Sequence, residues 1–219
     1  FCIKAEAKEK WIMNYFRIGM ILSNLQEFEK AIEWFDKATI SVNTAADEQL
    51  SWLIGLQKAN ALIKLNKNKS AEKLLDDAKE YLEKVIKEDK GLAFIPNIQL
   101  KIKMLRTELY INKGDLENAY VNISEIRNTK LKTGGDDVLL ALSLLYNLLG
   151  NIDEAYKYLD QFKEKFGIGR VVREIPEFFY SVETKNMRND SRFIELLKES
   201  KLYDYWKDEP EIKKLEKGK

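Results

Sequence analysis

The chain has 219 residues, of which 45% are hydrophobic and 33% are charged, with 37 Lys and Arg against 36 Asp and Glu. A mean hydropathy of −0.42 excludes a membrane protein, since no apolar run reaches the ~20 residues that span a bilayer. The interleaved, balanced charges argue against a nucleic acid or an anionic membrane as partner. The single cysteine, Cys2, permits no internal disulfide and favours a cytoplasmic location.

The sequence contains no histidine, which excludes histidine acid–base catalysis, Ser-His-Asp triads and histidine-containing zinc sites. The carboxylate pairs Asp76-Asp77 and Asp136-Asp137 are explained by solvated helix faces and helix caps. Cys2 lies near one end of the sequence, without a nearby base to activate it. We therefore expect no enzyme activity, no metal site and no cofactor.

The first part of the chain shows apolar residues at the 3.6-residue spacing of amphipathic helices. Asp47 is a candidate N-cap for the third of these helices, and Gly91 is a candidate stop for the fourth. Asn66-Lys67-Asn68 forms a predicted turn. The predicted helices cover residues 3–25, 27–42, 48–65 and 69–89.

Further helices follow, beginning near Pro96, which a first helical turn tolerates. Gly114-Asp115 and Gly150-Asn151 are predicted turns within them. The loop 133–136 lacks the lysine and the glycine spacing of a phosphate-binding loop, so Asp136 or Asp137 is predicted to cap the helix that runs through Leu149. Gly167-Ile168-Gly169 is predicted to end the helix after Phe166.

One pattern of small and large residues recurs along these helices. In its first copy, the small residues Gly19, Ala31 and Ala38 let two helices approach at the lower end of the usual ~8–10 Å, while Tyr15 and Phe35 fill the space around the crossing. The pattern resembles the tetratricopeptide repeat, a helix–turn–helix of about 34 residues. Its anchor alanines in the four copies are Ala31, Ala71, Ala119 and Ala155.

The resemblance implies an all-α, right-handed superhelix of about ten helices, with four helix pairs and C-terminal capping helices. The third copy is degenerate because Thr107 replaces the small residue of its first helix. We expect a repeat array over residues 1–169, capping helices over 170–206 and a flexible tail over 207–219. The expected repeat units lie near residues 12–45, 52–89, 96–131 and 136–166.

The run Arg188-x-Asp190-Ser191-Arg192-Phe193-x2-Leu196-Leu197 resembles the segment that closes such arrays in bacterial multidomain regulators, where they accompany cyclase, kinase or winged-helix domains. Ser191 stands where that segment usually has proline, and Asp190 or Ser191 is predicted to cap the helix that follows. Because the chain begins with Phe1 rather than Met, we expect a fragment of a longer protein. The predicted cover of the last apolar face comprises Phe193, Leu196, Leu197 and Leu202, extended by Tyr203, Tyr205 and Trp206.

The resemblance also implies a protein–protein interaction module, because one stripe of each first helix lines the concave face of such arrays. Three of the four methionines fall on this stripe, and methionine adapts well to irregular apolar partners. We expect Phe16 and Met20 to face solvent there. The candidate partner-binding residues are Met13, Phe16, Met20, Leu56, Asn60, Met104, Glu108, Leu140, Leu144 and Asn147.

Alternatives remain open for both the surface and the function. The C-terminal helices, residues 171–200, could fill the groove, or some stripe positions could be core. The expected function is a regulatory or scaffolding part of a larger bacterial protein that binds a peptide or a helix of a partner, with another copy of the chain as an alternative occupant. The alternative function is a peptide- or small-ligand-sensing domain that controls an attached effector. Phe16, Met20 and Leu105 occupy positions where repeats that bind chaperone tails carry Lys, Asn and Arg, which disfavours that partner.

Overall fold

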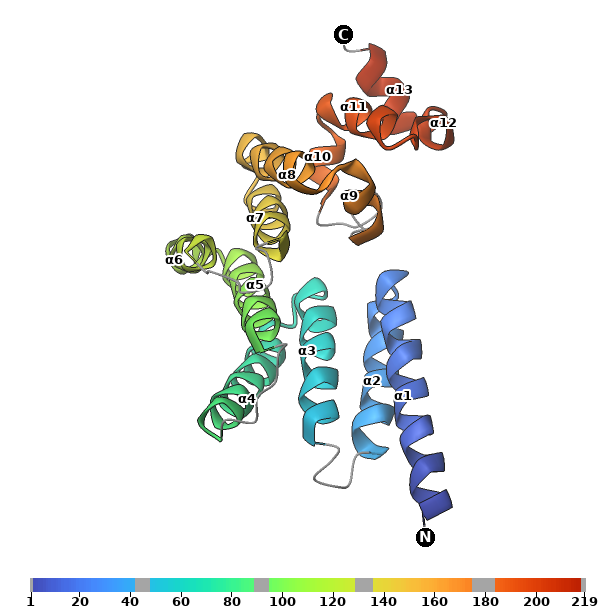
Figure 1. Ribbon diagram of the computed structural model, residues 1–219, viewed down its shortest axis with the longest axis vertical. Coiled ribbons are helices and arrows are strands. Elements are labelled where there is room, and N and C mark those ends of the chain that lie inside the picture. The colour runs from blue at the N-terminus through green and yellow to red at the C-terminus, as the bar shows by residue number, and fades with distance from the viewer. Residues whose placement is uncertain (1, 42–47, 89–94, 129–135, 175–183, 218–219) are drawn as a thin grey trace. The chain divides into compact units, whose positions relative to one another are not determined.

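A computed structural model describes residues 2–41, 48–88, 95–128, 136–174 and 184–217 of the protein (Figure 1). Within these ranges the chain forms thirteen helices and no strand. Predictions that concern Asp47, Gly91, the loop residues 133–135 and the apolar segment 175–180 lie outside the described residues. The helices are α1 (Cys2–Asn24), α2 (Phe28–Ser41), α3 (Glu48–Lys64), α4 (Asn68–Lys87), α5 (Ile95–Lys113), α6 (Leu116–Arg127), α7 (Asp136–Leu148), α8 (Ile152–Phe166), α9 (Ile168–Glu174), α10 (Lys185–Arg188), α11 (Arg192–Glu199), α12 (Tyr203–Trp206) and α13 (Pro210–Lys217).

The helices group into two compact units, residues 1–122 and 123–219. This boundary falls within α6, whereas the sequence predicted a single array through residue 169. In the first unit α1 packs on α2 and α3 packs on α4, and α2 and α4 pack in turn on α3 and α5, the helices that follow them. In the second unit α7 packs on α8. The predicted all-α organisation in helix pairs is confirmed, and the helices exceed ten because several short ones follow α8.

The turn inside each pair has one geometry. The chain enters the left-handed region at Gln26, Asn66, Gly114 and Gly150, with φ between 56° and 76°. The N–H of the next residue then bonds a carbonyl five residues earlier, at 2.9 Å in all four turns, as in a Schellman motif. The third copy, which Thr107 makes degenerate in sequence, keeps this turn. The four bonds join Glu27 to Leu22, Lys67 to Leu62, Asp115 to Tyr110 and Asn151 to Tyr146.

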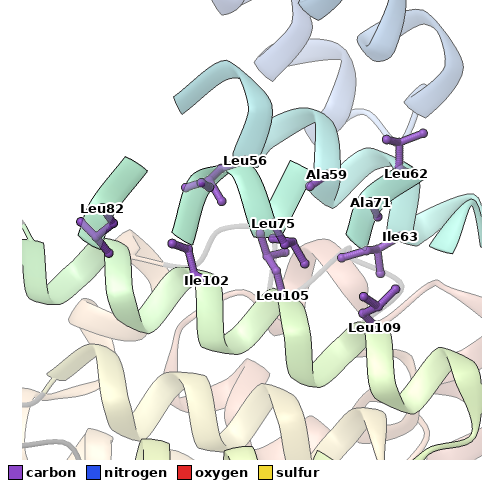
Figure 2. Close-up of a cluster of buried hydrophobic side chains, with 11 residues drawn as sticks. Leu56, Ala59, Leu62, Ile63, Ala71, Leu75, Leu82, Ile102, Leu105 and Leu109 are labelled. Carbon is purple, nitrogen blue, oxygen red and sulfur yellow. The ribbon is translucent and has the colours of Figure 1, made fainter. Parts of the chain in front are cut away.

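Two apolar clusters form the core of the first unit. The first joins α1, α2 and α3, and the second joins α3, α4 and α5, whose side chains converge in Figure 2. A Cβ at Gly19 would lie 2.5 Å from Cε1 of Phe35, so only glycine permits this crossing. The first cluster contains Ile12, Phe16, Ala31, Phe35, Ala38 and Ile54. The second contains Leu56, Ala59, Leu62, Ile63, Ala71, Leu75, Ala78, Leu82, Ile102, Leu105 and Leu109.

An ion pair recurs between successive helix pairs of the first unit. Asp36 of α2 pairs with Lys58 of α3, and Asp76 of α4 pairs with Arg106 of α5. Each aspartate directly follows a large residue of the repeat pattern, and each cation directly precedes the small position of the next first helix. Such partly exposed pairs contribute little stability. Their recurrence shows that each second helix meets the next first helix in the same register.

Residues 210–217, within the expected flexible tail, form the helix α13. Pro210 begins this helix, where its missing N–H is not needed. Ile212 is only 1% exposed, so the helix buries an apolar side chain. The Tyr203 hydroxyl also donates to Glu216 and ties α12 to α13.

The requirement for glycine at position 19 can be tested by comparison with a second glycine, Gly55, in another first helix. We expect Gly19→Ala to lower the free energy of unfolding by about 1–3 kcal/mol, because the added methyl overpacks against Phe35. Gly55→Ala is the matched control, since its Cβ would meet only Leu74 Cδ2 at 3.9 Å. We expect this control to raise the free energy of unfolding by about 0.5–1 kcal/mol through helix propensity. Urea denaturation followed by circular dichroism measures both, and equal effects would contradict the steric argument.

Candidate protein-interaction surface

The first helices of the first unit, α1, α3 and α5, form one continuous face, because α1 contacts α3 and α3 contacts α5. Four of the predicted binding residues lie half-buried on these helices: Met13, Met20, Asn60 and Met104. Met13 and Met20 pack against the edge of the first apolar cluster. A partner helix or peptide could bury the remaining surface of the three methionines. We refer to these four residues as the first-helix stripe.

The structure buries the other predicted residues of the first unit. Phe16 is 9% exposed and its ring lies 6.1 Å from that of Phe35, so the expectation that Phe16 faces solvent is wrong. Leu56 is 2% exposed within the second cluster. Each of these residues lies one turn before the small residue at which its helix crosses a neighbour. A large side chain there reaches the neighbouring helix instead of solvent. They belong to the core.

Glu108 is also buried, and it forms an ion pair. It bonds Lys64 of α3, and the two side chains are only 11% and 9% exposed. Beside this pair, the Asn112 side chain donates to the carbonyl of Ile63 at 3.0 Å. Removing one member of a buried pair leaves an uncompensated charge at a cost of about 3–5 kcal/mol. Glu108 therefore holds α3 against α5.

Lys64 and Asn112 were not among the residues predicted from the sequence. Each lies four residues after a predicted residue, Lys64 after Asn60 and Asn112 after Glu108, and so on the same helix face. Extending the stripe by one turn would have found both. The spacing does not show that Lys64 is buried, nor which groups the two side chains bond.

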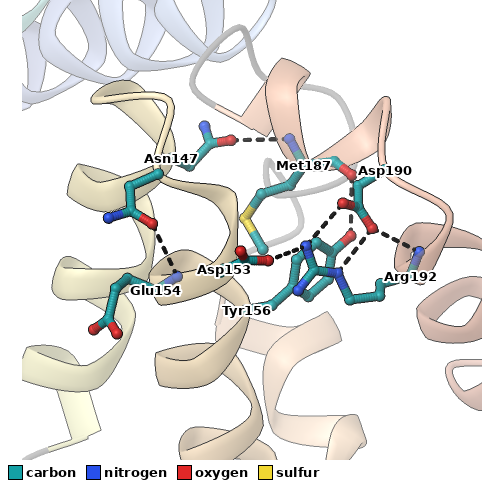
Figure 3. Close-up of polar contacts among 8 residues, drawn as sticks. Asn147, Asp153, Glu154, Tyr156, Met187, Asp190 and Arg192 are labelled. Atoms are coloured by element: carbon teal, nitrogen blue, oxygen red, sulfur yellow. Dashed lines mark hydrogen bonds and ion pairs between the residues drawn. The ribbon is translucent and has the colours of Figure 1, made fainter.

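In the second unit, the chain itself covers the predicted residue Asn147, which is 1% exposed. Its side-chain oxygen accepts a hydrogen bond from the Met187 N–H at 2.9 Å (Figure 3). Its backbone carbonyl accepts a second one from the Asn186 side chain at 3.0 Å. The Tyr156 hydroxyl donates to the Met187 carbonyl at 3.0 Å. The alternative that C-terminal residues occupy the stripe is therefore realised at Asn147. Of the other predicted residues here, Leu140 is buried and Leu144 is half-buried.

Arg192 connects the closing helices to α8. Its guanidinium bonds both carboxylate oxygens of Asp190 at 2.8 Å and Asp153 at 2.9 Å, and it lies 4.4 Å from the centroid of the Tyr156 ring (Figure 3). These bonds hold the pKa of Asp190 below its usual value, whereas burial raises the pKa of the Tyr156 hydroxyl. Tyr156 therefore stays protonated and can donate to Met187. Asp190 also accepts from the backbone N–H of Arg192, the first residue of α11, at 2.9 Å. The side chain of Ser191, at the N-cap position, makes no capping hydrogen bond.

The cover predicted from the closing segment is present in most of its parts. Phe193, Leu196 and Leu197 of α11 are buried. Trp206 packs edge-on against Phe193, with ring centroids 5.8 Å apart. Tyr205 is 82% exposed, so the prediction that it extends the cover is wrong. The four-residue helix α12 directs its side chains in different directions, and only one of its faces can meet α11.

A cavity of about 130 Å³ lies between α8 and α11. Small-molecule sites usually span about 300–1,000 Å³, so it is small for a ligand site. Its charged lining is already paired, since Lys163 bonds Asp160 at 3.2 Å and Glu199 at 2.7 Å. The lining residues are Tyr156, Leu159, Asp160, Lys163, Arg192, Glu195 and Leu196.

Among the described residues, no group of three or more Cys, Asp and Glu side chains is placed to hold a metal ion. In the same part of the chain, no helix is long and apolar enough to cross a membrane.

Two stretches of the chain match family models. Residues 14–39, which cover about half of α1 and most of α2, match a model described as a tetratricopeptide repeat. Residues 137–167, which cover nearly all of α7 and α8, match a second model with the same description. Comparisons with curated proteins and with solved structures gave no match. The two matched stretches coincide with the first and fourth copies of the pattern of small and large residues.

The Asn147–Met187 contact predicts a loss of stability on truncation. We expect Asn147→Ala to lower the free energy of unfolding by about 1–3 kcal/mol, because it leaves the buried Met187 N–H without its acceptor. Gln161→Ala, at an exposed position of α8, is the control and should change it by less than about 0.5 kcal/mol. Urea denaturation measures both, and an unchanged midpoint for Asn147→Ala would show that the bond is not maintained.

The pairing of Asp190 with Arg192 predicts a dependence on pH. A depressed carboxyl pKa stabilises the fold above the unfolded pKa, and this stabilisation is lost as pH falls through the folded pKa. The stability difference between wild type and Asp190→Asn should therefore be constant near neutral pH and shrink below pH 3.8, the usual value. Thermal unfolding between pH 7 and pH 2.5 measures it. Asp77→Asn, on the exposed face of α4, controls for the loss of a carboxylate. A stability difference for Asp190→Asn that grows in acid would contradict the lowered pKa of Asp190.

Proposed function

We propose that this chain, which belongs to the tetratricopeptide-repeat family, is a non-catalytic module that binds a protein partner on its first helices. Repeats of this family generally mediate protein–protein interactions. The observation that carries the proposal is the first-helix stripe, where Met13, Met20 and Met104 remain half-buried on adjoining helices. Methionine side chains of this kind adapt to irregular apolar partners.

The chemistry of the stripe favours an apolar helix or an extended peptide. Lys64 and Glu108, beside the stripe, neutralise each other's charge. This pair therefore exerts little net attraction on a charged ligand. Asn60 adds an amide that can hydrogen-bond a peptide backbone. Such a surface selects its partner by shape and apolar contact.

We further propose a regulatory or scaffolding role within a larger cytoplasmic bacterial protein. The support is the closing segment around Asp190, which resembles that of bacterial multidomain regulators and continues here into the helix α11. The sensor alternative has less support for a small ligand, because the cavity between α8 and α11 is small and its charges are paired. A peptide-sensing domain would use the same first-helix stripe.

Site-specific photocrosslinking tests the proposal. A benzophenone amino acid is introduced at Met20 or at Met104 in the full-length protein, and the irradiated cells of the source organism are analysed for crosslinked products. We expect both sites to crosslink the same protein. Ile86 of α4, which is 43% exposed, serves as the apolar control site away from the first helices.

The identified partner is then titrated against a Met20→Glu, Met104→Glu double variant. We expect the affinity for the partner to fall at least tenfold, because charged side chains replace both methionines at the apolar contact. Crosslinks formed equally from Ile86, or an unchanged affinity, would place the binding surface elsewhere.

A further inference from the structure

Three helices of the second unit bring Arg127, Tyr146 and Tyr158 together. Arg127 lies in the last turn of α6, Tyr146 belongs to α7 and Tyr158 belongs to α8. The two tyrosine rings stack, with centroids 5.5 Å apart and ring planes inclined by only 7°. None of the three residues belongs to the surface predicted from the sequence. We call them the Arg127 cluster.

The tyrosine hydroxyls hold the guanidinium of Arg127. This guanidinium donates a hydrogen bond to the Tyr146 hydroxyl. The phenolic oxygens of Tyr158 and Tyr146 both attract it, and they raise the pKa of Arg127 above its usual value. Because both oxygens act on one guanidinium, the two hydroxyls lie at the same end of the ring stack. The arginine is exposed to solvent, but its charged group is held in place.

Within the described residues, no carboxylate bonds Arg127. Other arginines of the chain are paired in the usual way, since Arg106 bonds Asp76 and Arg192 bonds Asp190. A tyrosine hydroxyl is neutral at pH 7, so its hydrogen bond to a guanidinium does not compensate the charge. The positive charge of Arg127 is therefore fixed in position and left without a counter-charge from the described chain.

The carboxylate of Glu154 lies near the cluster, where it acts on Tyr146, but it is already paired. Both of its oxygens bond Lys157 Nζ, at 2.8 and 3.1 Å. Glu154 and Lys157 thus cancel each other, and Arg127 leaves one net positive charge among these three ionised side chains. One positive charge matches a single carboxylate better than a phosphate group, which carries roughly two negative charges at pH 7.

The cluster also supplies several hydrogen-bond donors to one place. A hydroxyl that accepts from an arginine keeps its own proton to donate. In the described part of the chain, no group accepts a hydrogen bond from Tyr146 or Tyr158. Both side chains are held by burial, at 6% and 8% exposed, and burial raises the pKa of the Tyr146 hydroxyl, so that it keeps its proton. The fork of a guanidinium is suited to bond both oxygens of a carboxylate.

We propose that the Arg127 cluster binds one carboxylate group. The guanidinium provides the charge and N–H donors, and the hydroxyls of Tyr146 and Tyr158 provide O–H donors beside it. An acidic side chain of a partner protein and a small carboxylic acid offer this same group. The site shares no residue with the first-helix stripe, and it does not depend on the proposed function.

Nuclear magnetic resonance of the full chain with isotope-labelled arginine tests the proposal. The Nε–H resonance of Arg127 is assigned from its absence in Arg127→Lys and is followed during titration with acetate. We expect a saturable shift with acetate and none with acetamide, which is similar in size but uncharged. Arg17, exposed on α1, is the internal control, and its resonance should show no saturable shift.

Tyr146→Phe and Tyr158→Phe keep the stacked rings and remove only the hydroxyls. Each should weaken acetate binding at least about fivefold, because a hydrogen bond to a charged group is lost. Tyr120→Phe, at a position of α6 that is 49% exposed, is the matched control and should leave binding unchanged. Circular dichroism confirms that each variant is folded, and if one tyrosine variant is not, the other decides. Absence of a saturable Arg127 shift, or equal effects of the three variants, would overturn the proposal.

Further titrations test the class and the source of the carboxylate. Inorganic phosphate should bind no more tightly than acetate, and tighter binding would contradict a site for a singly charged group. The blocked peptide Ala-Ala-Glu-Ala-Ala should bind as acetate does, because Arg127 is exposed, whereas its glutamine counterpart should not bind. Exclusion of the glutamate peptide would assign the site to a small carboxylic acid. None of these outcomes depends on crosslinking from Met20 or Met104, so the two proposals fail separately.

Discussion

The close crossing of paired helices is the constraint on which the rest of the structure depends. At Gly19 the backbone of α1 lies so near the Phe35 ring that a single methyl group would overlap it. This approach lets α2 present Ala31, Phe35 and Ala38 to α3 as well as to α1. A second helix can serve two neighbours only because its small residues bring both within reach. The next pair then has a surface on which to form, and the pattern propagates.

Polar contacts set the register of this packing. The pairs Asp36–Lys58 and Asp76–Arg106 join successive helix pairs at the same repeat positions, and Lys64–Glu108 joins two first helices. Thr107 shows how a deviation from the pattern is accommodated. It is fully buried at a position where the other first helices carry smaller residues. Its hydroxyl donates a hydrogen bond to the Lys103 carbonyl at 2.8 Å, within the same helix. The polar atom is thus satisfied without a partner from another helix.

The first and last copies of the repeat pattern differ in how far their apolar surface is covered by other residues. After α8 the chain supplies its own cover, because Met187 enters between Asn147 and Tyr156 and α11 follows with four buried apolar residues. Arg192 fastens this cover through Asp190 and Asp153. On α1, by contrast, the apolar side chains of Trp11, Ile21 and Leu25 are exposed.

The helices, the turns and the repeat could be predicted from the order of the residues. The predicted helix 48–65 is Glu48–Lys64, and the predicted turns at Asn66, Gly114 and Gly150 are the left-handed residues of three hairpins. These features depend on residues within one or two turns of each other, so spacing is enough to predict them. The tertiary structure alone decided which stripe residues are accessible. Spacing placed Phe16 and Asn147 on the outer stripe, but Phe35 on the paired helix buries the first, and Met187, 40 residues away, binds the second. Helical periodicity specifies the direction of a side chain, whereas its burial depends on the distant segment that packs there.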